Sequence, residues 1–375
     1  MSTGPLAGLR VVELAGIGPA PFCAMLLADL GADVVRVDRP SGSAVAGLPS
    51  RDLLNRNKRS VLVDLKNDRG PEVVLRLAAE ADVLIEGYRP GVAERLGVGP
   101  EQCWERNSKL VYGRMTGWGQ EGPLAQSAGH DIGYIGITGV LHAIGRADGP
   151  PQVPLNLVGD FGGGSLYLAV GILAALRTGK GQVVDAAIVD GAAHLATMIY
   201  GLVSAGVWRP ERGANLLDTG APFYDVYETS DGEHMAVGPL EPRFYAKFVE
   251  LLGLADAGLP AQMDIPQWPV LRKRFAEVFA TRSREEWTAV FEGTDACVAP
   301  VLSLTEASSH PHIVARGTLV DRDGFVQPAP APRFSATPAE LRTPPAIPGQ
   351  HTREALADWG FDDIDELLAH GAVRE

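Results

Sequence analysis

The stretch GLRVVELAGIGPAPFCAMLLADLGADVVRVDRP, residues 8–40, decides the fold. Its pattern predicts a strand at about 10–14, a Gly/Pro turn, a helix at about 20–30 and a β-branched strand at 33–37. Gly31 is expected to end the helix, because glycine readily adopts the left-handed conformation that follows many helices. The stretch therefore predicts a βαβ unit with parallel strands.

Short apolar runs recur downstream, at VLVDL (61–65), DVLIEG (82–87) and KLVYGRM (109–115), with the helical pattern PEVVLRLAAEA (71–81) between the first two. Alternating strands and helices are typical of a parallel sheet covered by helices on both faces. We therefore expect an α/β protein with a large doubly wound, Rossmann-like domain. Further on, the apolar segment 186–208 predicts a long buried helix.

The pattern changes in the second half of the chain. YDVYETSDGEHMAVGP (224–239) predicts a hairpin closed at Asp231-Gly232, and amphipathic helical patterns follow near 242–254 and 269–280. Seven prolines within 327–350 predict an extended arm, and the amphipathic tail predicts a helix packed on a larger body. The expected domains are a large one at 1–205, completed by 322–375, and a small α+β one at 220–315, with linkers at 206–219 and 316–321.

Composition narrows the class of protein. The 375 residues include 33 Lys and Arg against 46 Asp and Glu, and the net charge of −13 argues against binding nucleic acid or an anionic membrane. Three widely spaced cysteines predict neither a disulfide framework nor a Cys-x-x-Cys metal site. The first residues, MSTGPLAGLR, lack the charged start and the continuous apolar run of a signal peptide, and the purely apolar run 166–176 is too short to span a bilayer. We expect a cytoplasmic protein without a membrane span.

Residues 36–69 carry a net positive charge, although the whole chain is negatively charged. Between residues 36 and 69 there are eight Lys or Arg against four Asp, which predicts either a solvated charged face or an anion site. Arg39 follows the second strand, where a doubly wound fold meets the ribose phosphate of a nucleotide. The turn AGIGPAP (15–21) resembles a dinucleotide turn, but Pro21 replaces the third glycine.

Acid or base residues lie at three predicted helix starts. His130 and Asp131 follow a Gly-rich loop, and a histidine there is either catalytic or merely exposed. Asp160 precedes three glycines and an apolar helix, so it is either a helix cap or a catalytic group whose glycine neighbours let a ligand approach backbone N–H groups. Glu241 begins EPRFY, where an acid also suits the helix dipole.

Ordered blocks along nearly the whole chain resemble the family III CoA-transferase superfamily. Asp160 matches the position of its catalytic aspartate, and His130 and Glu241 match the α-methylacyl-CoA racemase branch. The blocks include GHDIGY (129–134), LNLVGDFGGGS (155–165), GKGQVVDAAIVDG (179–191), RGANLLDTGAPFYDVYET (212–229) and GPLEPRFY (238–245).

The resemblance implies interconversion of (2R)- and (2S)-2-methylacyl-CoA thioesters through an enolate, without metal or cofactor. His130 and Asp160 would be the acid/base pair, and Glu241 would orient His130 from the partner chain of an interlocked homodimer. One alternative is a CoA-transferase in which Asp160 is a covalent nucleophile. The other is a non-catalytic scaffold that binds CoA or a nucleotide.

Further site residues follow from the glycines and from the resemblance. The backbone at Asp160, Gly162 and Gly163 would stabilise the enolate oxygen at a helix N-terminus. The expected substrate-binding residues are Arg39, Lys66, Arg89, Arg95, Asp131, Asn156 and Tyr224.

Overall fold

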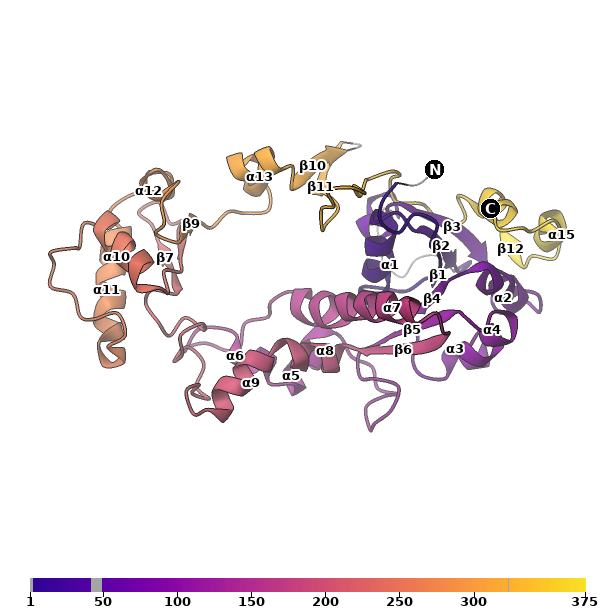
Figure 1. Cartoon of the computed structure of the whole chain (residues 1–375), viewed down its shortest axis with the longest axis horizontal. Helices are drawn as coiled ribbons and strands as arrows, with labels where there is room; N and C mark the ends of the chain where they lie inside the picture. Colours follow the sequence, from indigo (N-terminus) through magenta and orange to yellow (C-terminus); the bar gives the residue numbers. More distant parts are fainter. Residues whose placement is uncertain (1–2, 42–48, 323) are drawn as a thin grey trace. The chain divides into compact units, whose positions relative to one another are not determined.

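The computed structural model describes residues 3–41, 49–322 and 324–375, which divide into two compact units (Figure 1). The first unit runs to Thr138 and adds Leu155–Leu195 and Arg316–Glu375. The second unit contains Gly139–Pro154 and Ala196–Ala315.

These boundaries differ from the expected ones at several places. Residues 196–205 of the expected large domain and the expected linker 206–219 both belong to the second unit. Residues 139–154 join the second unit because the Arg212 side chain donates to the carbonyls of His142 (2.9 Å) and Arg146 (3.2 Å). The expected linker at 316–321 belongs to the first unit, where it leads into the hairpin of β10 (Leu319–Arg322) and β11 (Phe325–Pro328).

A seven-stranded sheet in the order β12-β3-β2-β1-β4-β5-β6 organises the first unit. All pairs are parallel except β12 with β3. Arg10 lies opposite Asp33 in neighbouring parallel strands, which confirms the predicted βαβ unit. The order 3-2-1-4-5-6 is that of a dinucleotide-binding fold, and its direction reverses between β1 and β4. The strands are β1 (Arg10–Leu14), β2 (Asp33–Asp38), β3 (Lys58–Val63), β4 (Val83–Glu86), β5 (Val111–Thr116), β6 (Gln182–Ala187) and β12 (Val373–Arg374).

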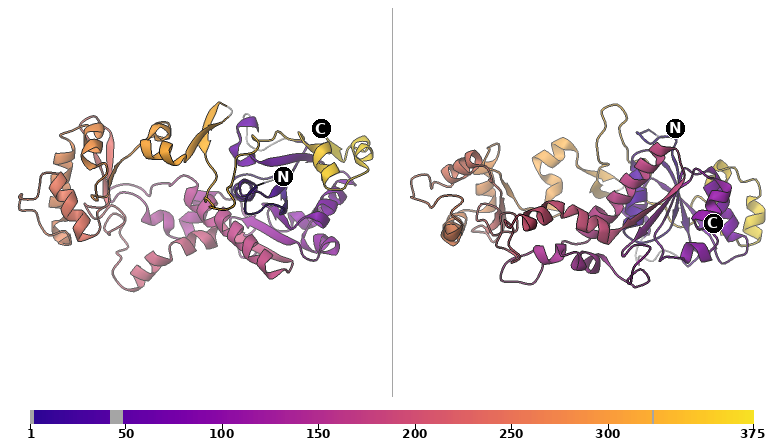
Figure 2. Two further views of the ribbon diagram at one scale, coloured as in Figure 1. Left: turned by 45° about the horizontal axis from the view of Figure 1, so that its top comes forward. Right: turned by 60° about the horizontal axis from the view of Figure 1, so that its bottom comes forward.

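Helices cover both faces of the sheet, as Figures 1 and 2 show. Val11 belongs to the core beneath α1 and α7, whereas Val12 belongs to the core beneath α2, α4 and the C-terminal helices, because successive side chains of a strand point to opposite faces. The helices of this unit are α1 (Pro19–Asp29), α2 (Gly70–Glu80), α3 (Val92–Arg95), α4 (Pro100–Arg106), α5 (Asp131–Ile137), α7 (Leu166–Thr178), α8 (Ile188–Leu195), α14 (Thr352–Asp358) and α15 (Ile364–Ala369), with short 3-10 turns η1 (Pro49–Arg51) and η2 (Leu53–Asn55).

The proline-rich arm returns the chain to this sheet. Arg36 donates to the carbonyl of Ala346 (3.1 Å), and Arg342 donates to the carbonyl of Ala28 (2.7 Å). The tail then buries Leu356 and Leu367 against the core beneath α2. The predicted amphipathic tail therefore does pack on a larger body.

The prediction of one long buried helix over 186–208 is wrong. The segment is divided into the end of β6, α8 and α9 (Thr197–Ser204). Many of its apolar side chains are exposed, among them Leu195 and Met198. Its small residues allow close packing, since a Cβ on Gly191 would collide with the backbone of Gly163 in the neighbouring helix.

The second unit is built on the antiparallel strands β7 (Asp225–Glu228), β8 (His234–Val237) and β9 (Val298–Pro300). The predicted hairpin is confirmed, and Gly232 at its turn has a φ of 78°. Aromatic side chains fill the core, with Phe248 and Phe275 at a centroid distance of 5.1 Å. The helices are α6 (Val140–Ala143), α9, α10 (Pro242–Leu251), α11 (Trp268–Phe279), α12 (Arg284–Phe291) and α13 (Pro311–Arg316), with 3-10 turns η4 (Ile265–Gln267) and η5 (Glu306–Ser309).

A π-helix, η3 (Leu157–Ser165), continues directly into α7. The resulting 22-residue helix, Leu157–Thr178, is long and apolar enough to cross a membrane, which the run 166–176 taken alone is not. A single helix of this kind is weak evidence for a span, because core helices of soluble proteins have the same length and composition. Here α7 packs on β5 and β6.

Candidate active site

A pocket of about 440 Å³ lies at the carboxyl ends of the strands in the first unit. Residues 15–20 after β1, 87–90 after β4 and 115–118 at the end of β5 line it, and so do residues of the loop that leads into α5. The strand order reverses between β1 and β4, and open α/β sheets bind their ligands at this switch point. The fold therefore places a ligand site here.

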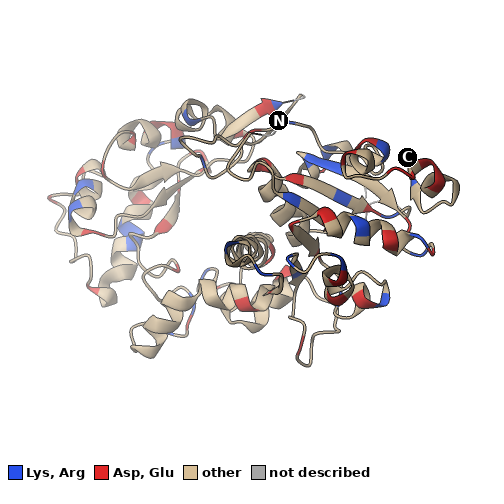
Figure 3. Cartoon of the chain, turned by 45° about the vertical axis from the view of Figure 1, so that its right-hand side comes forward, with Lys and Arg blue, Asp and Glu red and all other residues tan. Residues whose placement is uncertain are grey.

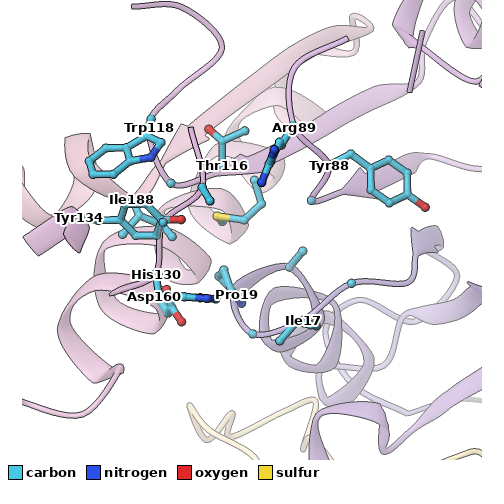
Figure 4. A pocket seen from close by; sticks show the side chains of 18 of the residues that line it. Ile17, Pro19, Tyr88, Arg89, Thr116, Trp118, His130, Tyr134, Asp160 and Ile188 are labelled. Carbon is cyan, nitrogen blue, oxygen red and sulfur yellow. The ribbon is translucent and has the colours of Figure 1, made fainter. Parts of the chain in front are cut away.

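His130 and Asp160 both line this pocket, although they lie 30 positions apart in the chain. Figure 4 shows them close to each other. His130 directly precedes α5 and is exposed, whereas Asp160 is half-buried in η3. The tertiary structure thus brings together a base and an acid that the sequence singled out separately.

The surroundings of Asp160 favour its protonated form. Burial raises the pKa of its carboxyl, and the nearby Asp131 raises it further. A hydrogen bond from Asn156 Nδ2 (3.4 Å) and the proximity of His130 act in the opposite direction. A carboxyl with a raised pKa beside a histidine is an arrangement that can exchange protons.

Two of the expected substrate-binding residues contact Asp160 instead of lining the pocket. Asn156 donates to its carboxylate, and Asp131 accepts the backbone N–H of Asp160 at 2.7 Å. Asp131 is only 6% exposed. Both side chains therefore contact Asp160 without lining the pocket themselves.

The expected enolate site at Asp160, Gly162 and Gly163 needs correction. Asp160 lies in the first turn of a helix that begins at Leu157, and its N–H is already bonded to Asp131. A Cβ on Gly163 would lie 2.6 Å from the backbone nitrogen of Ala192 in α8. Neither Gly162 nor Gly163 lines the pocket. These glycines allow η3 to pack closely on α8, so their role is in packing.

Contacts with the start of α1 hold η3 in place. The Ser165 hydroxyl donates to the carbonyl of Pro19 at 2.7 Å, and the rings of Phe22 and Phe161 stack at 4.5 Å. A Cβ on Gly18, which has a φ of 71°, would lie 3.4 Å from the Asp160 carboxylate. The turn after β1 therefore brings backbone close to Asp160.

Three of the eight cations in the basic window, Arg36, Arg56 and Lys58, are buried and so belong neither to an anion site nor to a solvated face, whereas others of the window are exposed. Several of its cations form buried ion pairs, so Figure 3 shows charged segments on the strands themselves. Such buried pairs are needed because an unpaired charge in the core is strongly unfavourable. The pairs are Arg36 with Asp38 (2.7 Å), Arg56 with Asp29 (2.6 Å) and Lys58 with Glu13 (2.6 Å).

Of the four cations expected to bind substrate, Arg39 and Arg89 line the pocket. Lys66 and Arg95 are exposed and do not line it. The structure therefore places two expected cations at the pocket and two outside it.

The aromatic wall of the pocket was not predicted. Trp118 and Tyr134 line it and meet edge to face at a centroid distance of 4.7 Å. Gly117 and Gly129 leave room for Tyr134, since a Cβ on either would collide with its ring. In the sequence, the glycines of TGWG (116–119) and GHD (129–131) were the feature from which this aromatic wall could have been predicted.

Glu241 and Tyr224 belong to the second unit and are both exposed. Glu241 directly precedes α10, as expected from EPRFY, but its side chain makes no capping hydrogen bond. Among the described residues, no group of three or more His, Cys, Asp and Glu side chains could hold a metal ion.

The chain resembles known proteins over nearly its whole length. The sequence model described as CoA-transferase family III matches residues 6–352. The chain is 46% identical to alpha-methylacyl-CoA racemase of Mus musculus, over 97% of this chain and 96% of that protein, and 48% identical to that of Homo sapiens, over 95% and 94%. A crystal structure of a CAIB/BAIF family protein from Brucella suis superposes with a TM-score of 0.82 at 27% identity, covering 95% of this chain and all of that one.

Proposed function

The chain belongs to CoA-transferase family III, and we propose that it is a racemase that interconverts (2R)- and (2S)-2-methylacyl-CoA thioesters. The observation that carries this proposal is that His130 and Asp160 line one pocket. Racemisation requires one group to remove the α-proton on one face of the carbon and another to return a proton on the opposite face. The high identity to proteins named racemases favours this reaction over acyl transfer.

The two groups share one proton. When His130 is the neutral base, Asp160 is the protonated acid, and in the reverse direction His130 starts as imidazolium and Asp160 as carboxylate. The burial that raises the pKa of Asp160 brings it closer to that of a histidine, so the two protonation states lie closer in energy. Proton transfer in both directions then becomes feasible.

CoA is held by charge in this proposal. Arg39 and Arg89 at the pocket bind its phosphates by charge-assisted hydrogen bonds, and Lys66 and Arg95 add attraction from farther out. The thioester itself acidifies the α-carbon, so the proposed reaction uses no metal or cofactor. Dialysis against EDTA is therefore expected to leave turnover unchanged.

The active enzyme in this proposal is a homodimer in which Glu241 of the partner subunit orients His130 and Tyr224 borders the substrate. Exposed apolar side chains support an interface: Ile137, Leu157, Val170 and Leu195 lie on four neighbouring helices and are each more than half exposed. Large exposed apolar surfaces commonly mark protein interfaces. A cytoplasmic location completes the proposal and fits three free cysteines.

Solvent-deuterium exchange tests this function. In D2O, one epimer of a 2-methylacyl-CoA is expected to incorporate deuterium at the α-carbon and approach an equal mixture of epimers. Replacing His130 by Ala is expected to slow inversion by roughly two to four orders of magnitude, the scale of a lost general base. Trapping of a covalent adduct on Asp160, with activity only when an acceptor acid is added, would establish the transferase instead.

A further inference from the structure

A buried carboxylate that does not line the pocket, that of Glu86, accepts a hydrogen bond from the loop that carries Arg89. Glu86 is the last residue of β4 and is only 3% exposed. Its Oε2 accepts the backbone N–H of Tyr88 at 2.6 Å, and Tyr88 and Arg89 both line the pocket. The conformation of this loop therefore depends on a group that the proposed mechanism does not use.

Arg114 of β5 connects Glu86 to two neighbouring segments. Its Nε lies 3.7 Å from Glu86 Oε1, its Nη1 donates to Gln120 Oε1 at 2.8 Å, and its Nη2 donates to Glu94 of α3. Glu94 follows the loop of Arg89, and Gln120 follows the pocket segment 115–118. The Nε–H is buried and makes no hydrogen bond to any described residue, so the charge of Glu86 offsets its burial.

We propose that Glu86 and Arg114 form a positioning pair, which holds the loop of Arg89 in the orientation that binds the phosphates of CoA. The pair touches neither of the groups proposed to move protons, since His130 and Asp160 lie on α5 and η3. Its loss is therefore expected to weaken CoA binding much more than the chemical step. The inference rests on the proposed function for the identity of the ligand.

The same geometry makes CoA affinity depend on pH. Burial raises the pKa of Glu86 to about 7, and the charges of Glu94 and Asp185 also raise it, whereas the N–H of Tyr88 and the guanidinium of Arg114 lower it. The phenols of Tyr88 and Tyr112 also lie near Glu86, and burial together with the charge of Glu86 raises the pKa of both. Protonation of Glu86 below pH 7 removes the ion pair with Arg114, so affinity is expected to fall as the pH decreases.

Calorimetric titration with CoA between pH 6 and 8.5 tests the pair directly and requires no turnover. At pH 8 the Glu86→Gln variant is expected to bind CoA about three- to tenfold more weakly, part of the contribution of a charge-assisted hydrogen bond. Its affinity is also expected to vary less with pH than that of the unmodified protein, because titration of the CoA phosphates affects both proteins equally. Its kcat at saturating substrate is expected to stay within about twofold.

Glu80→Gln is the matched control, because this exposed glutamate pairs with Arg10 at the surface, away from the residues that line the pocket. It is expected to reproduce the unmodified affinity and pH profile. If Glu86→Gln does not fold, Glu94→Gln loosens the same guanidinium from its exposed side and is expected to weaken binding by a smaller factor. An unchanged affinity in the folded variant, or a fall in kcat at unchanged affinity, would overturn the inference. Absence of α-deuterium exchange in the unmodified protein, with pH-dependent CoA binding retained, would refute the racemase and leave the positioning pair supported.

Discussion

The backbone N–H of Asp160 donates a hydrogen bond of 2.7 Å to Oδ2 of Asp131. Asp131 is the first residue of α5, directly after His130, and Asp160 lies in η3. One hydrogen bond therefore joins the two elements that carry the proposed acid and base. The second carboxylate oxygen of Asp131 is buried without a hydrogen-bond partner among the described residues, so its charge acts on Asp160 with little screening.

The first prediction concerns the pH dependence of turnover. The charge of Asp131 raises the pKa of Asp160, so Asp131→Asn is expected to lower that pKa. The carboxylate form of Asp160, which one direction of the proposed reaction requires, is lost below its pKa, so the acid limb of the pH–rate profile is expected to move to lower pH in this variant. Asn156→Ala removes a hydrogen bond that lowers the same pKa and is expected to move the limb to higher pH. Exchange rates measured across pH check both; shifts in the same direction would contradict the assignment.

The second prediction separates the cations at the pocket from those outside it. Arg39→Glu is expected to raise KM for the acyl-CoA by about tenfold or more, because it replaces a charge-assisted contact with repulsion. Lys66→Glu, an equal change of charge outside the pocket, is expected to raise KM much less, by an amount that vanishes at high salt. Initial rates at two ionic strengths distinguish the cases, and equal effects would place CoA elsewhere.

The third prediction tests whether Glu241 acts from the partner subunit. His130→Ala and Glu241→Gln are each expected to be nearly inactive alone. In a mixed dimer one site would combine the intact His130 of one chain with the intact Glu241 of the other, so co-refolding equal amounts is expected to restore about a quarter of full activity. If Glu241 acts within its own chain, every site carries a defect and mixing restores nothing.

The fourth prediction concerns stability. Gly163→Ala places a Cβ against the backbone of α8, so it is expected to destabilise the protein by about 1–3 kcal/mol, the usual effect of overpacking. Gly136→Ala is the control, because its Cβ would meet nothing within 4 Å in α5, and stability is expected to stay equal or to rise by up to about 1 kcal/mol. Urea denaturation at constant m-value measures both. Equal midpoints for the two variants would contradict the packing role of Gly163.

Local patterns predicted the elements well where the local signal was strong. The βαβ unit of residues 8–40 and the hairpin at Asp231-Gly232 follow from hydrophobic periodicity and turn chemistry, which act over a few residues. The segment 186–208 was predicted wrongly because its uniformly apolar composition does not show where β6 ends or where α8 and α9 separate. The same limit applied to Gly162 and Gly163, whose close neighbour α8 is supplied by a distant part of the chain.

By itself, the sequence determined the fold class and the identity of the acid and base candidates, since both rest on short-range spacing and on ordered blocks that resemble a known family. Only the tertiary structure decided which charged side chains are available to bind a ligand. Arg56 and Lys58 read as part of a basic window, yet burial obliges them to pair with Asp29 and Glu13 in the core. Arg39 remains at the pocket because it follows the end of β2. Whether a charge is buried depends on contacts between residues far apart in the chain, so no local sequence pattern predicts its burial.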